Sequence, residues 1–456
     1  MIKLSSFKGF AQRHTRAEKT PYLGFLNDVP EYLRSEISLD GIRRDLFQYH
    51  NSAKRPTDPV FWKAVAASAR RFRMQPVHPR HLNDIINDNT LDIWSSSPCL
   101  PWSQYGYKSK KDVINDPACV RSIRTFWSRI KQGYHITAPD SMAHVRSHLI
   151  KRGEPNKLRA VWGYPLTMVL GEAMFALPLI AACKKVTPIA YGYETAVGGM
   201  RKIVHESAHC KYFSALDFKS FDKTVPLWLI DIAFDVLESN LDLTRYQDYG
   251  VPDTTALYRC WDYIKSYFKY TTIRLANGER YKKIVGVPSG SYFTQLIDTI
   301  VNAILLEYAF MKQGIEIDYV KILGDDSIIG SMMKLDLDDA QDLLSQLGMT
   351  INAAKSGQSR YISELEFLGY QICSGYPIRP YQKWLASLAY PEFPDKTLDD
   401  FMSRALGLGY ANASGDDRFD KLVRFILSWK YKFKITFGRN FDRWLRSQGI
   451  EHMDVA

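Results

Sequence analysis

Residues 319–331 decide the fold, and they read YVKILGDDSIIGS. Two apolar runs, 319–323 and 327–329, flank the tripeptide Gly-Asp-Asp at 324–326, which predicts a hairpin of two buried strands. Two adjacent carboxylates at a tight turn between apolar strands cost free energy unless something neutralises them. A divalent metal ion does this well, because hard cations take oxygen ligands. We therefore expect a metal-binding turn at this tripeptide.

The same tripeptide occurs a second time, so its context has to decide its meaning. At average composition Gly-Asp-Asp arises by chance in about one chain in ten of this length. The second copy, Gly415-Asp416-Asp417, follows Ala-Asn-Ala-Ser and precedes Arg418, which is the context of a polar loop or a helix cap. We expect a structural role for this copy and chemistry at the first.

A second acidic element precedes the hairpin. Residues 211–216 read KYFSAL and predict a short strand that ends at Asp217, and Asp222 follows five positions later. If two strands end side by side, Asp217 and Asp325 come within reach of two Mg²⁺ ions, which can activate an attacking 3′-hydroxyl and stabilise a pyrophosphate leaving group. The alternative is that both acidic residues cap a helix that starts near Pro226, and taken alone they favour this cap.

Two further elements are suited to binding a nucleotide. The loop 286–294 reads GVPSGSYFT, whose glycines permit close backbone approach, and the hydroxyls of Ser289 and Thr294 can bond a ribose. Thr294, Asp298 and Asn302 share one face of the helix predicted after this loop. A Gly/Ser loop before a helix is, by itself, weak support for any function.

Lys157 and Arg159 lie on a segment that is expected to be extended, so both project to one side. A guanidinium fork beside an ammonium point charge suits a triphosphate, although a solvated basic face explains the pair equally well. The chain carries a formal net charge of +11, spread along 456 residues. This suits a channel for a phosphate-bearing partner as well as a generally basic soluble protein.

Length and composition predict two or three packed lobes. The six cysteines lie far apart without zinc spacing, so we expect free thiols in a reducing compartment. The most apolar stretch, 167–183, contains Glu172 and Pro178 and is shorter than about 20 residues, which predicts a buried helix and no membrane association.

Local patterns predict the remaining elements. Helices are expected at 226–237, 291–310 and 336–347 and over most of the last eighty residues, and a hairpin turn is expected at Asn277-Gly278. The sum is an α+β protein with a small antiparallel sheet surrounded by helices.

Taken in chain order, these elements resemble the motif series of viral RNA-dependent RNA polymerases. The series runs KxR, DxxxxD, SGxxxT and GDD at residues 157–159, 217–222, 289–294 and 324–326, followed by Lys355 and by EFLGY at 366–370. The resemblance spans roughly residues 95–410. The stretches GVPSGSYFTQLID, LGDDS, SSPxLPW and SRALGLGYA are most similar to partitivirus-type polymerases of double-stranded RNA viruses.

This resemblance implies a right-hand polymerase of fingers, palm and thumb. The N-terminal region and fingers would comprise residues 1–165, the palm 166–238 and 285–376, a fingers insertion 239–284, and the thumb 377–456.

The resemblance also implies roles for individual residues. Asp217 and Asp325, assisted by Asp326, would bind two Mg²⁺ ions, for which Mn²⁺ can substitute, and Lys355 would protonate the leaving pyrophosphate as general acid. The incoming nucleotide would be held by Lys157, Arg159, Asp222, Ser289, Gly290, Thr294 and Asn302. Residues 95–101, including Ser97, Pro98 and Pro101, would guide the template, and a turn formed by Glu366, Phe367, Leu368, Gly369 and Tyr370 would grip the primer strand.

The implied activity is template-directed addition of ribonucleoside triphosphates to an RNA 3′-hydroxyl, for replication and transcription of a viral RNA genome. The partners would be RNA template and product, ribonucleoside triphosphates and, by family analogy, a capsid protein, in the host cytoplasm inside the virion. The mode of initiation, the preferred template, the host and the oligomeric state stay open.

Three departures from the family pattern bear on the site. Asp298 stands where an asparagine usually follows Thr294, and Asn302 lies one turn later. Because two close carboxylates repel unless one is protonated or bonded elsewhere, we expect Asn302 to be the polar partner of Asp222. Cys99 stands where a glycine is common, and Lys355 is placed by position alone.

Two other functions compete with this interpretation. A reverse transcriptase also uses two metals, but it usually carries a bulky residue where Gly324 stands. In addition, Asp222 and the Ser289-Gly290 loop suit recognition of a ribose 2′-hydroxyl, which a reverse transcriptase excludes. A non-catalytic RNA-binding or capsid-associated protein would use the basic charge and the 27 tyrosines for phosphate contact and stacking. It gives no reason for the separate acidic and hydroxyl elements.

Overall fold

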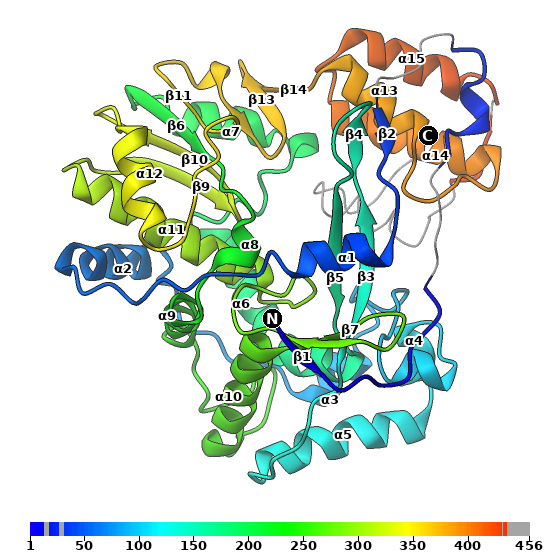
Figure 1. Cartoon of the computed structure of the whole chain (residues 1–456), viewed down its shortest axis with the longest axis vertical. Helices are drawn as coiled ribbons and strands as arrows, with labels where there is room; N and C mark the ends of the chain where they lie inside the picture. Colours follow the sequence, from blue (N-terminus) through cyan, green and yellow to red (C-terminus); the bar gives the residue numbers. More distant parts are fainter. Residues whose placement is uncertain (13–17, 27–31, 431, 436–456) are drawn as a thin grey trace.

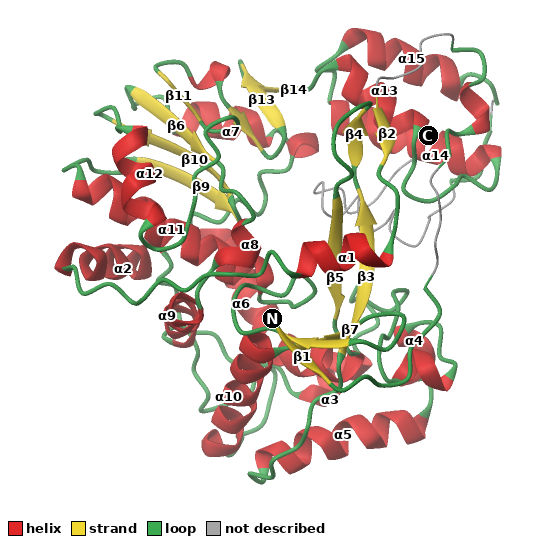
Figure 2. Ribbon diagram, in the orientation of Figure 1, coloured by secondary structure: helices red, strands yellow, loops and turns green. Residues whose placement is uncertain are grey.

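The structure is a computed structural model that describes residues 1–12, 18–26, 32–430 and 432–435. Figure 1 shows a four-stranded sheet with its helices at one side, a C-terminal helical lobe beside it, and a third lobe of helices and a second sheet below. Figure 2 shows that helices surround both sheets. The α+β class with a small antiparallel sheet is therefore as expected from the sequence.

The four-stranded sheet is antiparallel and has the order β11-β6-β10-β9. Its strands are β6 (Tyr212–Leu216), β9 (Tyr319–Leu323), β10 (Asp326–Ser331) and β11 (Gly357–Ser359). The predicted hairpin around the first Gly-Asp-Asp is confirmed as β9 and β10. Buried apolar residues, Ile322, Ile328 and Ile329 among them, hold the hairpin in place.

Five helices contribute to the hydrophobic core that also contains Ile322 and Ile329 of this sheet. They are α2 (Pro59–Arg71), α6 (Leu166–Val186), α9 (Leu227–Glu238), α11 (Thr294–Lys312) and α12 (Leu337–Ser345). Helix α11 packs against β9, α2, α9 and α12. Within α6, the stretch Leu166–Lys184 is long and apolar enough to cross a membrane, but 78% of that window is buried inside the protein.

The second sheet is mixed and has the order β1-β8-β7-β3-β5. Its strands are β1 (Ile2–Leu4), β3 (Ser141–Ser147), β5 (Leu158–Gly163), β7 (Thr272–Arg274) and β8 (Arg280–Lys282). The predicted turn at Asn277-Gly278 joins β7 to β8. Around this sheet lie α1 (Leu39–Leu46), α3 (Leu82–Asn87), α4 (Lys110–Ile114), α5 (Pro117–Lys131) and α10 (Thr254–Tyr270).

The C-terminal lobe has a hydrophobic core of its own. It contains α13 (Tyr381–Ala389), α14 (Leu398–Asn412) and α15 (Asp417–Leu427), as the sequence predicted for the part of this region that the structure describes. Residues 436–456 of that prediction lie outside the described residues. A three-stranded sheet of β12 (Glu366–Phe367), β13 (Tyr370–Cys373) and β14 (Tyr376–Ile378) precedes the lobe.

An N-terminal segment ties the C-terminal lobe to the rest of the molecule. Leu23, in a 3₁₀ helix (Pro21–Leu23), is part of the core of that lobe with Trp384 and Phe401. Strand β2 (Tyr32–Arg34) pairs with β4 (Leu149–Lys151), and Arg34 donates to the carbonyls of Tyr390 and Ser147. Residues before α1 thus link the C-terminal lobe to β4.

Shorter elements complete the fold. They are α7 (Gly199–Glu206), α8 (Phe221–Thr224) and 3₁₀ helices at Trp102–Tyr105, Thr195–Val197 and Ile362–Glu364. All six cysteines lie within the described residues and are free, as expected.

One helix starts later than predicted. Residues 291–293 were expected to open the helix, but α11 begins at Thr294. The Ser291 hydroxyl accepts a bond from the Phe293 amide and donates to Glu172, so this segment forms a turn that is fixed to α6.

The second Gly-Asp-Asp has the structural role predicted from its context. Asp416 is the N-cap of α15, and its carboxylate accepts the Phe419 amide at 2.8 Å. An aspartate at this position satisfies a backbone donor that the helix itself leaves unpaired.

Candidate catalytic site

Two acidic strand ends meet at one edge of the four-stranded sheet. The register between β6 and β10 ends at Leu216 opposite Ser327, so continuing it places Asp217 opposite Asp326, with Asp325 next in the turn. Cα atoms of opposite residues in an antiparallel pair lie about 4.5–5.5 Å apart. Carboxylates more than 100 positions apart in the chain therefore converge, and β6 and β10 lie side by side in Figure 1.

The electrostatics of this edge are those of carboxyl groups that lie close together. Burial raises the pKa of Asp325, and the charge of Asp217 raises it further. Burial and then the charges of Asp325 and Asp217 raise the pKa of Asp326 to about 7. Such mutual repulsion is relieved by a nearby positive charge, so these oxygen donors fit a divalent cation.

Among the described residues, no three Asp, Glu, His or Cys side chains form a ready-made metal cage. This does not conflict with Mg²⁺, which keeps several waters and is usually held by one or two carboxylates together with substrate phosphates.

The segment after α12 holds Asp217 from the other side. The Asn352 amide side chain donates to Asp217 Oδ1 at 2.9 Å, and the Asn352 backbone N–H donates to the Asp217 carbonyl at 2.8 Å. Lys355 Nζ lies 3.5 Å from Asp217 Oδ2, and 62% of the lysine side chain is exposed. An ion pair this exposed contributes little stability, so the lysine is free to turn toward a bound ligand.

The turn that carries Asp325 needs a glycine. Gly324 has φ +66°, and a Cβ there would lie 2.8 Å from the Gln295 Oε1 atom. Its amide donates to the Thr299 hydroxyl at 2.9 Å, and Asn302 Nδ2 donates to the carbonyls of Gly324 and Asp325, each at 3.0 Å.

The expected pairing of Asn302 with Asp222 is wrong. Both amide hydrogens of Asn302 are used by the turn, and its remaining oxygen cannot donate to a carboxylate. Asp298 faces Asp222 instead: burial, and then the charges of Asp222 and Asp325, raise the pKa of Asp298 well above its usual range. Protonation, which this shift favours, would give Asp298 a donor like that of an asparagine amide.

The hydroxyls expected to bind ribose hold the loop 286–292 in this structure. The Ser289 hydroxyl accepts the Trp162 amide at 3.1 Å, and the Thr294 hydroxyl donates to the Pro288 carbonyl at 2.6 Å. A Cβ at Gly290 would lie 1.7 Å from the Trp162 carbonyl oxygen, so the loop packs too closely on β5 for any other residue. Ser289 itself is exposed.

Two buried ionisable side chains hold the ends of this loop. The Glu172 carboxylate accepts the Ser291 hydroxyl at 2.7 Å and the Tyr292 amide at 2.9 Å. Lys283 Nζ donates to the carbonyls of Gly286 at 2.7 Å and Lys269 at 2.8 Å. Sequence reasoning missed both roles, although a carboxylate inside the most apolar stretch of the chain was a signal that it had a polar partner.

Glu172→Gln tests this anchor through the pH dependence of stability. Burial raises the pKa of Glu172 to about 8, whereas an unfolded glutamate has its ordinary value near 4.5. The folded state therefore binds the proton more tightly, and this contribution to stability is complete below about pH 4.5 and lost as the pH rises to about 8. We expect the melting temperature of wild type to fall relative to Glu172→Gln between these values, and a constant difference from pH 5 to 9 would contradict the anchor.

The predicted triphosphate-binding residues lie near the carboxylates. Arg159 is on β5, Lys157 precedes that strand, and both are exposed. Burial and then the charges of Arg159 and Lys355 lower the pKa of Lys157, while Asp217 raises it. Arg159 also acts on the carboxyl of Asp325. Both cations therefore interact electrostatically with carboxylates of the acidic edge.

The predicted template loop is built around a left-handed residue. Cys99 has φ +58°, in the left-handed region that glycine adopts readily and other residues adopt rarely. Lys110 Nζ donates to the Ser96 hydroxyl at 2.7 Å and to the Ser97 carbonyl at 2.8 Å, and the Pro98 carbonyl accepts the Leu166 amide. These bonds fix residues 96–99 beside the start of α6.

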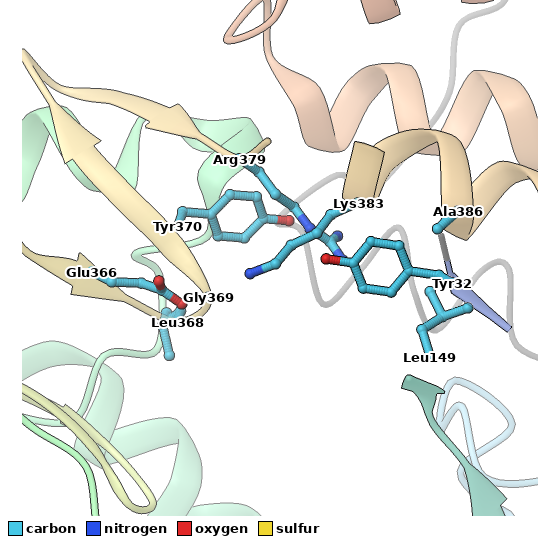
Figure 3. Close-up of a pocket in the computed structure, with 9 residues that line it drawn as sticks. All are labelled: Tyr32, Leu149, Glu366, Leu368, Gly369, Tyr370, Arg379, Lys383 and Ala386. Atoms are coloured by element: carbon cyan, nitrogen blue, oxygen red, sulfur yellow. The ribbon is translucent and has the colours of Figure 1, made fainter. Parts of the chain in front are cut away.

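A cavity of about 310 Å³ lies at the predicted primer-gripping turn. Figure 3 shows the side chains of Tyr32, Tyr370, Arg379 and Lys383 converging on one space between β2, β13 and α13. Glu366 lines the same cavity, and its charge contributes to raising the pKa of Asp326. The cavity therefore adjoins the acidic edge.

The chain is similar to known polymerases along most of its length. A family model described as viral RNA-dependent RNA polymerase matches residues 11–430. A solved structure titled Sicinivirus 3Dpol RNA dependent RNA polymerase has a TM-score of 0.72, with 98% of both chains covered and 15% sequence identity, so it shows a shared fold.

Three curated relatives are each named RNA-directed RNA polymerase. The protein from Atkinsonella hypoxylon virus is 29% identical over 63% of this chain and 50% of its own length, and that from White clover cryptic virus 1 is 25% identical over 68% and 56%. The protein from Cryptosporidium parvum virus 1 is 29% identical over 93% and 82%. The chain thus spans about half the length of the first two relatives.

Proposed function

The chain belongs to the family of viral RNA-dependent RNA polymerases, and from this premise we propose that it is an active polymerase that adds ribonucleotides to an RNA 3′-hydroxyl. The observation that carries the proposal is the convergence of Asp217 with Asp325 and Asp326 at one edge of the sheet. A charge cluster that lacks its counter-ion is costly in a purely structural role, but it is required where cations must bind.

In this proposal each residue group has a separate task. Two Mg²⁺ ions held by Asp217, Asp325 and Asp326 would supply the activation of the 3′-hydroxyl and the neutralisation of the leaving pyrophosphate, and Mn²⁺ would substitute for them. Lys157 and Arg159 bind the triphosphate, and Lys355 donates a proton to the leaving group. Asp222, together with protonated Asp298, recognises the ribose 2′-hydroxyl next to the loop formed by Ser289, Gly290 and Thr294.

The proposal also assigns the residues that contact the template and the primer. Ser97, Pro98 and Pro101 guide the template past α6, and Glu366, Phe367, Leu368 and Gly369 grip the primer strand beside the cavity of Figure 3. The domain division proposed above then assigns residues 166–238 and 285–376 to the palm, 1–165 and 239–284 to the fingers, and 377–456 to the thumb. The polymerase would replicate and transcribe a viral RNA genome inside the virion in the host cytoplasm, in contact with a capsid protein.

Primer extension tests the proposal directly. The purified chain is incubated with a primed RNA template, Mg²⁺ and either four ribonucleotides or four deoxyribonucleotides. We expect full-length RNA with ribonucleotides, little product with deoxyribonucleotides and none after chelation of the metal. Equal use of deoxyribonucleotides would favour a reverse transcriptase, and RNA binding without any extension would favour the non-catalytic alternative.

Substitution in the second Gly-Asp-Asp should affect stability and not activity, the opposite of substitution in the first. Asp416→Ala removes the N-cap of α15 and should lower the free energy of unfolding by about 1 kcal/mol, because one backbone donor loses its partner. Nucleotide addition by the folded variant should equal that of wild type within the error of a single-turnover assay. A complete loss of activity in a folded Asp416→Ala protein would mean that the catalytic copy was assigned wrongly.

A further inference from the structure

The turn between β9 and β10 is held by side chains of another element. Three backbone groups in this turn bond to α11: the amide of Gly324 to Thr299, and the carbonyls of Gly324 and Asp325 to Asn302. The two carbonyls belong to the peptide units on either side of the Asp325 Cα atom. Asn302 therefore restrains both dihedral angles of the residue that carries the predicted metal ligand.

The two α11 residues are well suited to this task. Thr299 and Asn302 are three positions apart, so they lie on the same face of the helix, and both are fully buried. Hydrogen bonds away from water are stronger and more directional than those at the surface. Helix α11 is itself enclosed by β9, α2, α9 and α12, so the restraint comes from a rigid element.

A restraint is needed at this point because the carboxyl groups repel one another. The β6–β10 register, continued by one residue, places Asp217 opposite Asp326, and Asp325 is the next residue in the turn. Without a cation the turn would relax by moving Asp325 away from Asp217. Bonds from α11 prevent this movement and keep the oxygens at a separation that a cation can bridge.

A purely structural role for Asn302 explains the observations less well. Asn302 Oδ1 is buried and has no hydrogen-bond partner among the residues that the structure describes. An unpaired buried oxygen costs free energy, so packing alone would favour a residue without one. The two amide hydrogens are the part of this side chain that the structure uses.

We propose that Thr299 and Asn302 are positioning residues that hold the Gly324–Asp325 turn in the geometry required for binding divalent cations. The inference rests on the proposed function and adds to it the reason why Asn302, one helical turn beyond the residue that faces Asp222, is an asparagine. Neither residue touches the metal; each acts through the backbone of the turn.

The test measures cation binding without turnover. Thr299→Val keeps the shape of the side chain but removes the hydroxyl, Thr299→Ser keeps the hydroxyl, and Asn302→Leu removes both donors. Mn²⁺ binding to each full-length protein, without nucleotide, is measured by titration calorimetry or from the paramagnetic signal of free Mn²⁺. We expect Thr299→Val and Asn302→Leu to bind Mn²⁺ about 10–100-fold more weakly than wild type, and Thr299→Ser to recover most of the affinity.

The second Gly-Asp-Asp supplies a matched control. Asn412 is fully buried and donates to the Asp416 carbonyl at 3.1 Å and to Asp420 Oδ1 at 2.8 Å. Asn412→Leu therefore removes the same groups beside the same tripeptide in the C-terminal lobe. It should lower the melting temperature as Asn302→Leu does, but leave the affinity for Mn²⁺ and the Mg²⁺ dependence of nucleotide addition unchanged.

The outcomes separate this inference from the proposed function. A wild-type chain that extends RNA, with a folded Thr299→Val variant that binds Mn²⁺ as wild type does, overturns the inference alone. If Asn302→Leu does not fold, the comparison of Thr299→Val with Thr299→Ser decides. A wild-type chain that neither binds Mn²⁺ nor extends RNA overturns the proposed function and this inference with it.

Discussion

Asp325→Asn should abolish nucleotide addition and leave the chain folded and bound to RNA. Asparagine keeps the shape of the side chain but removes the charge, so the affinity for the cation and the stabilisation of charge in the transition state are both lost. We expect the single-turnover rate at saturating Mg²⁺ to fall by more than about 10³-fold, the range found when one electrostatic contact to a transition state is removed. Binding of labelled RNA should change little, because basic side chains elsewhere in the protein hold the RNA phosphates.

The stability of this variant distinguishes lost chemistry from lost folding. Burial and the charge of Asp217 raise the pKa of Asp325, so without metal its ionised form is less favourable in the folded state than in the unfolded state. Removing the charge should therefore not lower, and near neutral pH should raise, the melting temperature measured in a chelator. Asp416→Asn, in the second Gly-Asp-Asp, is the matched control, because asparagine also serves as a helix N-cap.

Asp217→Ala should have the same effect from the other strand. Its carboxylate lies opposite Asp326 in the β6–β10 register, and Asn352 and Lys355 both contact it. Measurable nucleotide addition by folded Asp217→Ala or Asp325→Asn protein, at more than a few per cent of wild type, would contradict the two-carboxylate site. Loss of RNA binding together with activity would instead place these residues in the RNA-binding surface.

The sequence predicted those parts of the site that depend on neighbouring residues. The two apolar runs that flank 324–326 were sufficient for the hairpin, since strand pairing across a tight turn is local. The polar context of Gly415 was likewise sufficient for the helix cap at Asp416. Convergence of Asp217 with Asp325 required a long-range strand pairing, and only the resemblance to a family supplied it.

Contacts between distant elements were predicted less well. Asn302 was preferred to Asp298 as the partner of Asp222 because two close carboxylates repel. Helical spacing gives the face of a helix but not its rotation relative to the neighbouring turn. In the structure, two residues on the same face of α11 have different partners. Asp298 interacts with Asp222, and Asn302 donates to the carbonyls of Gly324 and Asp325. A difference of one helical turn, about 5.4 Å, decides which backbone a side chain can reach.

Buried charges were missed for a related reason. Glu172 and Lys283 anchor the loop 286–292 from α6 and from the segment after β8, elements that are far apart in sequence. The apolar surroundings of Glu172 signal a polar partner but not which one, because the partners of both side chains are backbone groups and a serine. Leu23, which packs into the core of the C-terminal lobe with Trp384, is a further case. Its partners lie more than 350 positions away in the chain.

Lys355→Ala should slow nucleotide addition by about 10²–10⁴-fold, the usual contribution of a positioned general acid. Lys355 Nζ is 3.5 Å from Asp217 Oδ2, which places the ammonium group beside the predicted metal ligands. Most of the Lys355 side chain is exposed, and Asp217 would bind the metal ion once one is present. The lysine can therefore turn to the leaving pyrophosphate. The measurement is the single-turnover rate with a preassembled primer–template, so that product release does not mask the chemical step.

Lys355→Arg separates proton donation from charge. Arginine keeps the positive charge near Asp217 but holds its proton in proteins, so it neutralises the pyrophosphate without protonating it. If Lys355 is the general acid, the arginine variant should stay nearly as slow as the alanine variant, and the solvent deuterium isotope effect of wild type should shrink in both. A fully active arginine variant would assign Lys355 to electrostatic binding of the triphosphate, together with Lys157 and Arg159. An undiminished rate for Lys355→Ala would remove it from the chemical step and leave its contact with Asp217 as an ion pair at the surface.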